Sequence, residues 1–325
     1  MTPARTKRFN AAADNVFRVR QFTTETGGSE REVPFRSVGD ERRQPKRRRM
    51  PSIWPNSDFH LAMRPVYLLD KALPMAAIGR FQKGDDIFYA KVIDGELFRL
   101  QGDVFGSPSY EKKPVPLRGV KTLTPVNPSK VIAVGLNYAD HARESGKPLP
   151  KEPLFWLKAP TSLLPDGGKI EIPFANHRTD FEAELAVVIG RRIRNVTPAA
   201  AARYIFGYTA AQDVSDRTIQ NAESQWARSK SFDTFTPLGP YVETKIDPHD
   251  LTIQLFQNGQ LRQNSNTSQL IFNTYHLVSF ISTNLTLLPG DVILTGTPSG
   301  VGPIESGDRL EVRIQGLAPL VNTVK

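Results

Sequence analysis

Segment 179–190 constrains the fold of this chain more than any other. It reads Thr-Asp-Phe-Glu-Ala-Glu-Leu-Ala-Val-Val-Ile-Gly, and its apolar, β-branched second half is typical of a buried strand. Side chains alternate between the two faces of a strand, so Glu182 and Glu184 project to the same side. Two carboxylates beside a buried strand repel each other and lose hydration, and a divalent cation is the simplest compensation. The alternative is an exposed edge strand with two solvated glutamates.

The composition narrows the class of protein. The chain has 325 residues, of which 39% are hydrophobic, enough for one large core or for a large and a small domain. No apolar run reaches the roughly 18 residues of a membrane-spanning helix, so we expect a cytoplasmic protein without membrane contact. The chain has no cysteine, which excludes disulfides, thiolate metal ligands and a cysteine nucleophile.

The positive charge is concentrated at the N-terminus. The chain carries 42 Lys/Arg and 33 Asp/Glu, of which residues 1–49 hold 13 and 6, leaving 29 and 27 for the rest. This polar segment ends in a basic cluster at 42–49 and is predicted to be a disordered tail. Such a cluster can contact nucleic acid, but we favour disorder without an assigned function.

The rest of the chain divides into two predicted domains. Strand-like segments at 76–81, 87–92 and 96–100, separated by turn signals, predict a small β-rich domain over residues 50–125. A catalytic domain is predicted over residues 126–325, with strands that outnumber its helices. This pattern favours a mixed β (α+β) body with peripheral helices. Helices are expected at 136–144, with Asn137 as a cap, at 198–206 and at 215–228.

Asp213 follows the predicted strand that starts at Gly207. Together with Glu182 and Glu184 it would complete an oxygen-rich site that suits Mg²⁺ or Mn²⁺. The alternative for Asp213 is a helix cap, because a polar helix is expected directly after it.

His141 and Glu144 have the i, i+3 spacing of neighbours on one helix face. A histidine oriented by a carboxylate can act as a general base, although a lone histidine is more commonly a surface or core residue. On the residues alone, Lys230 is interpreted as a solvated loop lysine.

The glycine-rich segment 294–303 is not a phosphate loop. It lacks the Gly-Lys-Ser/Thr ending, contains two prolines and precedes no predicted helix. It forms either a wall of a small-molecule site or an ordinary turn.

Taken together, these segments resemble the fumarylacetoacetate hydrolase superfamily. Any one motif is weak, but the chain presents six in the family's order: Val134-Gly135-Leu136-Asn137-Tyr138 with His141 and Glu144, Phe155-Trp156-Leu157-Lys158, Asp180-Phe181-Glu182-Ala183-Glu184-Leu185, Gly207-Tyr208 with Asp213, Arg217 and Gln220, Lys230-Ser231-Phe232, and segment 294–303. The resemblance runs from about residue 130 to residue 325, and the preceding small domain also looks like one found ahead of this fold.

The resemblance implies a family-type β-roll, usually in homodimers, and a role for each matching residue. Glu182, Glu184 and Asp213 match the ligands of Mg²⁺ or Mn²⁺. The other matches are catalytic His141, Glu144 and Lys230, and substrate-binding Arg217, Gln220 and Thr297.

The implied substrate is a small 2-oxo acid that reacts through a metal-bound enolate. The expected reaction is hydrolysis of a C–C bond in an acylpyruvate, with His141 activating water and Lys230 balancing charge. Decarboxylation of oxaloacetate, and isomerisation or tautomerisation of a 2-hydroxymuconate-like diacid, are the alternatives, because all three pass through one enolate. A non-catalytic binding protein on the same fold is the alternative of another class.

Overall fold

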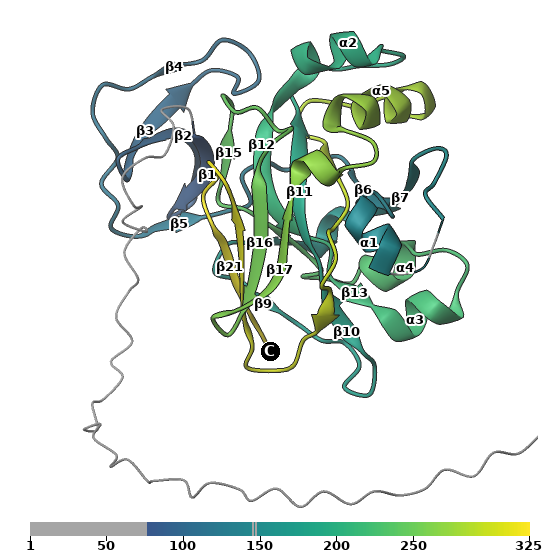
Figure 1. The fold of residues 1–325 in the computed structure, drawn as a ribbon. Coiled ribbons are helices and arrows are strands. Elements are labelled where there is room, and N and C mark those ends of the chain that lie inside the picture. Colours follow the sequence, from purple (N-terminus) through teal and green to yellow (C-terminus); the bar gives the residue numbers. More distant parts are fainter. Residues whose placement is uncertain (1–76, 145, 147) are drawn as a thin grey trace, which may run out of the picture. The chain divides into compact units, whose positions relative to one another are not determined.

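The computed structural model describes residues 77–144, 146 and 148–325; the predicted tail and residues 50–76 of the predicted small domain lie outside them. The described part is mostly β structure, with helices outside the sheets (Figure 1), as the sequence predicted. The three sheets have thirteen, three and five strands.

The largest sheet joins the N-terminal strands to the main body. Strand β1 pairs antiparallel with β15, so both segments share one continuous sheet. Its main path is, in order, β4 (Ser109–Tyr110), β3 (Glu96–Gln101), β2 (Asp86–Ile93), β1 (Ala77–Lys83), β15 (Tyr241–Glu243), β12 (Ile205–Gln212), β11 (Ala183–Ile189), β18 (Val292–Leu294), β6 (Val131–Gly135) and β7 (Leu154–Lys158). Beside this path lie β5 (Val120–Thr122), β8 (Leu163–Pro165) and β14 (Thr236–Leu238).

Two smaller sheets complete the body. The five-stranded sheet has the order β17 (Gln260–Asn266), β16 (Thr252–Gln257), β20 (Arg309–Ile314), β21 (Leu320–Val324) and β9 (Lys169–Ile170). The three-stranded sheet is β13 (Ser215–Asp216), β10 (Thr179–Phe181) and β19 (Gly302–Pro303).

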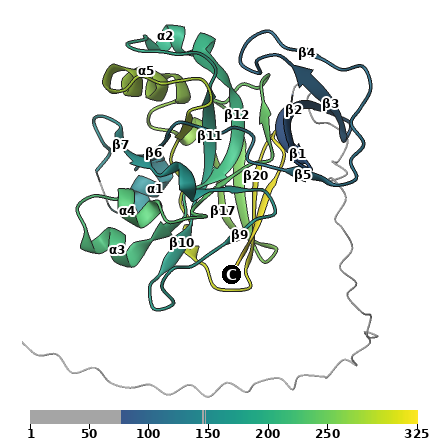
Figure 2. The same cartoon turned by 180° about the vertical axis from the view of Figure 1, so that it is seen from behind.

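The helices gather in two groups that both views display (Figures 1 and 2). Helices α2 (Pro198–Ala201) and α5 (Thr274–Asn284) pack together at one end of the long strands. Helices α1 (Ala139–Glu144), α3 (Arg217–Ala222) and α4 (Ala227–Lys230) lie along one flank. Three short 3₁₀ turns are η1 (Pro160–Ser162), η2 (Ala202–Tyr204) and η3 (Thr267–Gln269).

Strand β11 is buried on both faces, which explains its uninterrupted apolar sequence. Leu185 and Val187 belong to a core shared with β16 and β20, whereas Ala186 and Val188 belong to a second core shared with β6 and β18. A shift of the strand by one residue would move the side chains of both cores to the wrong face. The register of β11 therefore fixes where Glu182 and Glu184 lie.

The bounds of all three predicted helices differ from the observed ones. The helix expected at 136–144 begins only at Ala139. The helix expected at 198–206 ends earlier, because Ile205 enters β12 and pairs with Ile189. The helix expected at 215–228 is a short strand followed by α3 and α4, with Asp216 as the N-cap of α3.

Asn137 does not serve as a cap. Its amide nitrogen donates to the carbonyls of Phe272 (3.0 Å) and Thr295 (2.7 Å), and its Oδ1 accepts from the Phe272 amide. The buried Asn137 side chain therefore ties the start of α1 to two distant loops instead of capping the helix.

Candidate active site

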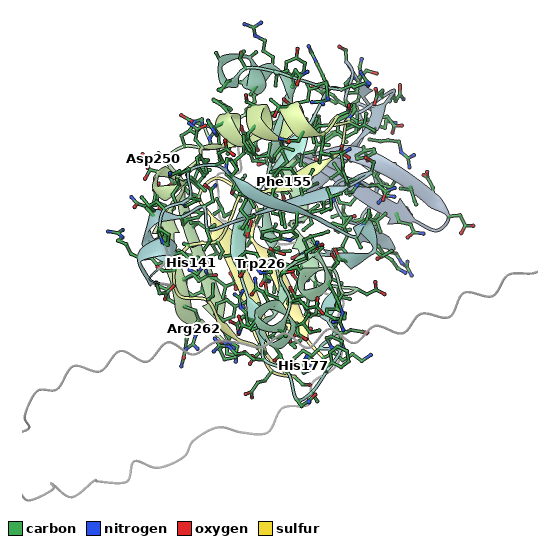
Figure 3. All side chains as sticks on the ribbon, turned by 90° about the vertical axis from the view of Figure 1, so that its right-hand side faces the viewer. His141, Phe155, His177, Trp226, Asp250 and Arg262 are labelled. Atoms are coloured by element: carbon green, nitrogen blue, oxygen red, sulfur yellow. The ribbon has the colours of Figure 1, made fainter. Side chains whose placement is uncertain are left out.

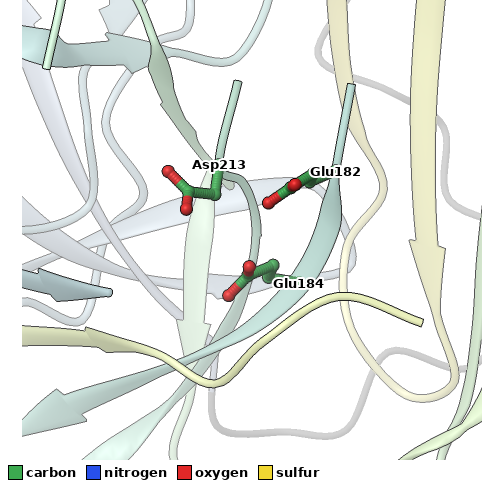
Figure 4. Close-up of side chains that lie close together, drawn as sticks. All are labelled: Glu182, Glu184 and Asp213. Atoms are coloured by element: carbon green, nitrogen blue, oxygen red, sulfur yellow. The ribbon is translucent and has the colours of Figure 1, made fainter. Parts of the chain in front are cut away.

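The three candidate metal ligands come together at the junction of β10, β11 and β12. Antiparallel pairing sets Ala183 opposite Gln212, and the Asp213 amide donates to the Glu182 carbonyl at 3.0 Å. The carboxylates of Glu182, Glu184 and Asp213 converge (Figure 4), and one oxygen from each lies within 4.8 Å of the others. All three residues are buried, which excludes the alternative of a solvated edge strand.

Two lysines bond the Asp213 carboxylate, one at each oxygen. Lys230 Nζ donates to Asp213 Oδ2 at 2.6 Å and to Glu182 Oε2 at 2.8 Å, while buried Lys158 donates to Asp213 Oδ1. Lys158 also donates to the carbonyl of Phe235 at 2.9 Å. Lys230 is therefore a buried bridge between two carboxylates and not the solvated loop lysine that its surroundings in the sequence indicated.

Glu182 and Glu184 have different electrostatic environments. Burial alone would raise the pKa of Glu182, but Lys230 and Arg217 outweigh it and hold this pKa at about 2. Burial, followed by the charges of Asp213 and Glu182, raises the pKa of Glu184 well above its usual range. Its carboxylate accepts a hydrogen bond from the Gly296 amide at 2.7 Å, and it forms no ion pair within the described residues.

This asymmetry fits a divalent cation. A buried carboxylate without a cationic partner, converging with two others, offers the hard oxygen ligands that Mg²⁺ and Mn²⁺ take. Glu182, Glu184 and Asp213 could therefore hold a metal ion, which would supply the positive charge that Glu184 lacks.

Helix α1 places the second candidate group at the pocket. His141 Nδ1 lies 3.2 Å from Glu144 Oε2, and the Gly300 amide donates to Glu144 Oε1 at 3.2 Å. The His141 side chain is 18% exposed and that of Glu144 47%. Because Nδ1 faces a carboxylate, the neutral ring keeps its proton there, and Nε2 is the nitrogen left to exchange one.

One pocket of about 280 Å³ brings these groups together. Its polar lining includes Glu182, Glu184, Lys230 and His141. Glu144 and Asp213 are not part of the lining, but Glu144 contacts His141 and Asp213 is bonded by Lys230. The apolar lining consists of Val134, Leu136, Trp156 and Trp226. Figure 3 labels His141 and Trp226, two of the lining residues.

The two tryptophans form an aromatic wall. The centres of their rings lie 5.2 Å apart in an edge-to-face arrangement, and Lys230 Nζ lies 5.1 Å from the centre of the Trp156 ring. A Cβ atom at Gly135 would come within 2.9 Å of Trp156 and 3.0 Å of Trp226. Glycine at this position therefore allows both rings to approach β6.

The three predicted substrate-binding residues also line the pocket. The Arg217 guanidinium is committed to the protein, because it donates to Asp180, Glu182 and Gln220. The hydroxyl of Thr297 donates to the Ala183 carbonyl and accepts from Gln263, both at 2.9 Å. The Oε1 of Gln220 accepts from Arg217, whereas its Nε2 has no hydrogen-bond acceptor among the described residues.

Residue-by-residue reasoning gave no role to Lys158, Trp156, Trp226 or Asp180. Lys158 ends the apolar strand β7, and this position is the only local feature of the sequence that sets it apart from a surface lysine. No local pattern marks Asp180 or Trp226, because their partners Arg217 and Trp156 are distant in the sequence.

Comparison with known proteins identifies the class. The model of the fumarylacetoacetate (FAA) hydrolase C-terminal domain matches residues 130–325, and that of the Rv2993c-like N-terminal domain matches residues 77–125. The chain therefore belongs to the fumarylacetoacetate hydrolase family, and the predicted fold class is confirmed.

Three similar proteins indicate the range of activities. Oxaloacetate tautomerase FAHD2B, mitochondrial, from Bos taurus is 42% identical over 223 residues, 65% of this chain and 71% of that protein. The crystal structure of 2-hydroxyhepta-2,4-diene-1,7-dioate isomerase from Mycobacterium marinum is 39% identical, with a TM-score of 0.71 over 77% of this chain and 98% of that one. Fumarylpyruvate hydrolase from Pseudomonas aeruginosa, in complex with Mn²⁺ and pyruvate, is 30% identical, with a TM-score of 0.58 over 66% of this chain and 92% of that one.

These relatives are named as a tautomerase, an isomerase and a hydrolase, so the family to which the chain belongs includes enzymes that catalyse several reactions. Within the described residues, no helix is long and apolar enough to cross a membrane.

Proposed function

We propose that this protein is a Mg²⁺- or Mn²⁺-dependent enzyme that moves a proton between carbon and oxygen of a small 2-oxo acid. The observation that carries the proposal is one pocket of about 280 Å³ served by both the carboxylate triad and the His141–Glu144 pair. The tautomerase and isomerase relatives, at 42% and 39% identity, favour proton transfer over the hydrolysis that we expected first.

Each group has a role in this proposal. Glu182, Glu184 and Asp213 would hold the metal, which would supply a Lewis acid for the 2-oxo oxygen. His141 Nε2 accepts the acidic proton from C3 of the substrate and returns it to the oxygen, while Glu144 fixes the tautomer. The Lys230 ammonium is positioned to balance negative charge that develops on the substrate.

Hydrolysis of an acylpyruvate is the second candidate, supported by the hydrolase relative and by the carboxylate behind His141. Here Nε2 of His141 accepts a proton from water, whose oxygen adds to the C4 carbonyl. The C3–C4 bond then breaks, and C3 of the resulting enolate takes the proton held by His141, leaving pyruvate and a carboxylate.

Proton NMR of the Mg²⁺-loaded protein with oxaloacetate and, separately, acetylpyruvate distinguishes these reactions. Faster keto–enol exchange without cleavage, lost on adding EDTA, is the expected result. Pyruvate with acetate from acetylpyruvate would select the hydrolase, and pyruvate with CO₂ from oxaloacetate a decarboxylase. No EDTA-sensitive change with either compound would contradict the proposal.

A further inference from the structure

Seven side chains of alternating charge, two of them from the carboxylate triad, form a continuous series of ion pairs. This series of ion pairs begins at exposed Arg178 and ends at fully buried Lys158. Its members are, in order, Arg178, Asp180, Arg217, Glu182, Lys230, Asp213 and Lys158. Two of the three candidate metal ligands belong to it, so groups outside the pocket can influence how those ligands are held.

Asp180 is the one buried anion of this series of ion pairs that does not belong to the carboxylate triad. It is 1% exposed and accepts hydrogen bonds from Arg178 Nε at 2.8 Å, from Arg178 Nη2 at 3.0 Å and from Arg217 Nε at 2.9 Å. Its backbone lies in β10, between β13 and β19, where Asp180 is paired with Ser215 and Pro303. The carboxylate therefore has a fixed position from which it holds Arg217.

Arg217 transmits this position to the triad. The three nitrogens of its guanidinium each have one acceptor: Nε bonds Asp180, Nη1 bonds Gln220 at 2.7 Å and Nη2 bonds Glu182 Oε1 at 2.6 Å. A planar guanidinium held at three points cannot rotate without breaking at least one of these bonds. Glu182 Oε1 is thereby fixed, and Lys230 fixes Oε2.

Asp180 also balances the charge of Arg217. Without this anion, Glu182 would be the nearest remaining carboxylate bonded to the guanidinium, and the full attraction of Arg217 would fall on it. A carboxylate drawn more strongly to an arginine is a poorer ligand for a metal ion. Loss of Asp180 should therefore weaken metal binding through both orientation and charge.

We propose that Asp180 is a positioning residue of the metal site, acting through Arg217 on Glu182. The inference rests on the proposed metal binding and extends it to a residue outside the pocket. Partners that orient metal ligands typically change affinity by about 10- to 100-fold when removed, and for Asp180 we expect about tenfold.

The test is the Mn²⁺ dissociation constant of the full-length protein, measured by electron paramagnetic resonance of free Mn²⁺, for wild type, Asp180→Asn and Arg178→Ala. Asp180→Asn should raise this constant by about tenfold. Arg178→Ala, at the exposed end of the series of ion pairs, should change it by less than about twofold. Thermal unfolding in EDTA separates a positioning role from a purely structural one, because it reports the fold without metal.

A second variant covers the case in which Asp180→Asn does not fold. Arg217→Lys keeps the positive charge but replaces the planar, three-nitrogen guanidinium with a single nitrogen that cannot reproduce the three separate bonds, so it should also weaken Mn²⁺ binding. Unchanged Mn²⁺ affinity in Asp180→Asn or in Arg217→Lys would overturn the proposal, as would an equal loss in Arg178→Ala. Wild type that binds no Mn²⁺ would instead overturn the proposed function, and this inference with it.

Discussion

The buried charge cluster, made of the carboxylate triad with Lys158 and Lys230, and the His141–Glu144 pair on α1 are built in opposite ways. In the cluster, Asp213 is fully buried and bonded by two lysines. On α1, one 3.2 Å contact joins an imidazole to a carboxylate that is about half exposed. The cluster is fixed by several partners, whereas the pair depends on a six-residue helix and one amide of a neighbouring loop.

This difference indicates a division of labour. Groups that must hold a charge in one place benefit from fixed partners, because preorganised dipoles and charges need not rearrange during the reaction. A group that must move a proton needs one oriented partner and access to the substrate. Substitutions in the cluster should therefore affect stability and metal binding, and substitutions on α1 should affect the reaction alone.

Asp213→Ala should have the largest effect. It leaves Lys158 and Lys230 buried without their shared acceptor, and breaking a buried ion pair from one side costs about 3–5 kcal/mol. Urea unfolding in EDTA should report this loss of free energy, and calorimetry should detect no Mn²⁺ binding. A variant as stable as wild type would show that the cluster is less rigid than its contacts indicate.

Glu184→Gln separates metal binding from stability within the cluster. Glu184 forms no ion pair in the described structure, so its neutral analogue leaves no cation unpaired and removes a costly buried charge. Mn²⁺ affinity should fall by more than about 100-fold, while the free energy of unfolding in EDTA stays equal or rises. A marked destabilisation in EDTA would contradict this distinction between Glu184 and Asp213.

His141→Ala tests the other half of the comparison. The turnover rate should fall by about 10²–10⁴-fold, because the base is gone, while the Mn²⁺ dissociation constant changes by less than about twofold. Steady-state rates and Mn²⁺ titrations of one preparation provide both values. Equal losses of activity and metal binding would mean that the two regions are not independent.

The same division explains what could be predicted from the sequence. That Glu182 and Glu184 project to the same side follows from strand alternation, which is a local rule. Asp213 reaches them through the antiparallel pairing of β11 with β12, and its role was predicted from the family resemblance. Lys158 and Asp213 are 55 positions apart, and Asp180 and Arg217 are 37 apart, so no spacing rule links them. The strands were recognisable individually, but their order in the sheet depends on long-range pairing.

The break between α3 and α4 has a similar cause. A continuous polar helix over 215–228 agrees with local propensity. Trp226, however, packs against Trp156 on β7 and lies beside Gly135 on β6. Tertiary packing of an aromatic ring outweighs the modest helical preference of Glu223, Ser224 and Gln225.

Glu144→Gln should have the smallest effect on the turnover rate, and it tests what the carboxylate contributes to the His141–Glu144 pair. The amide oxygen can still accept from Nδ1 of His141 and hold the same tautomer, but it no longer stabilises a protonated ring. Because the Glu144 side chain is about half exposed, solvent screens much of that charge, and we expect the rate to fall by only about tenfold. Glu152→Gln, at another exposed glutamate, is the matched control and should leave the rate unchanged. A loss as large as that of His141→Ala would mean that the carboxylate charge itself is required, and no loss would mean that His141 works without this partner.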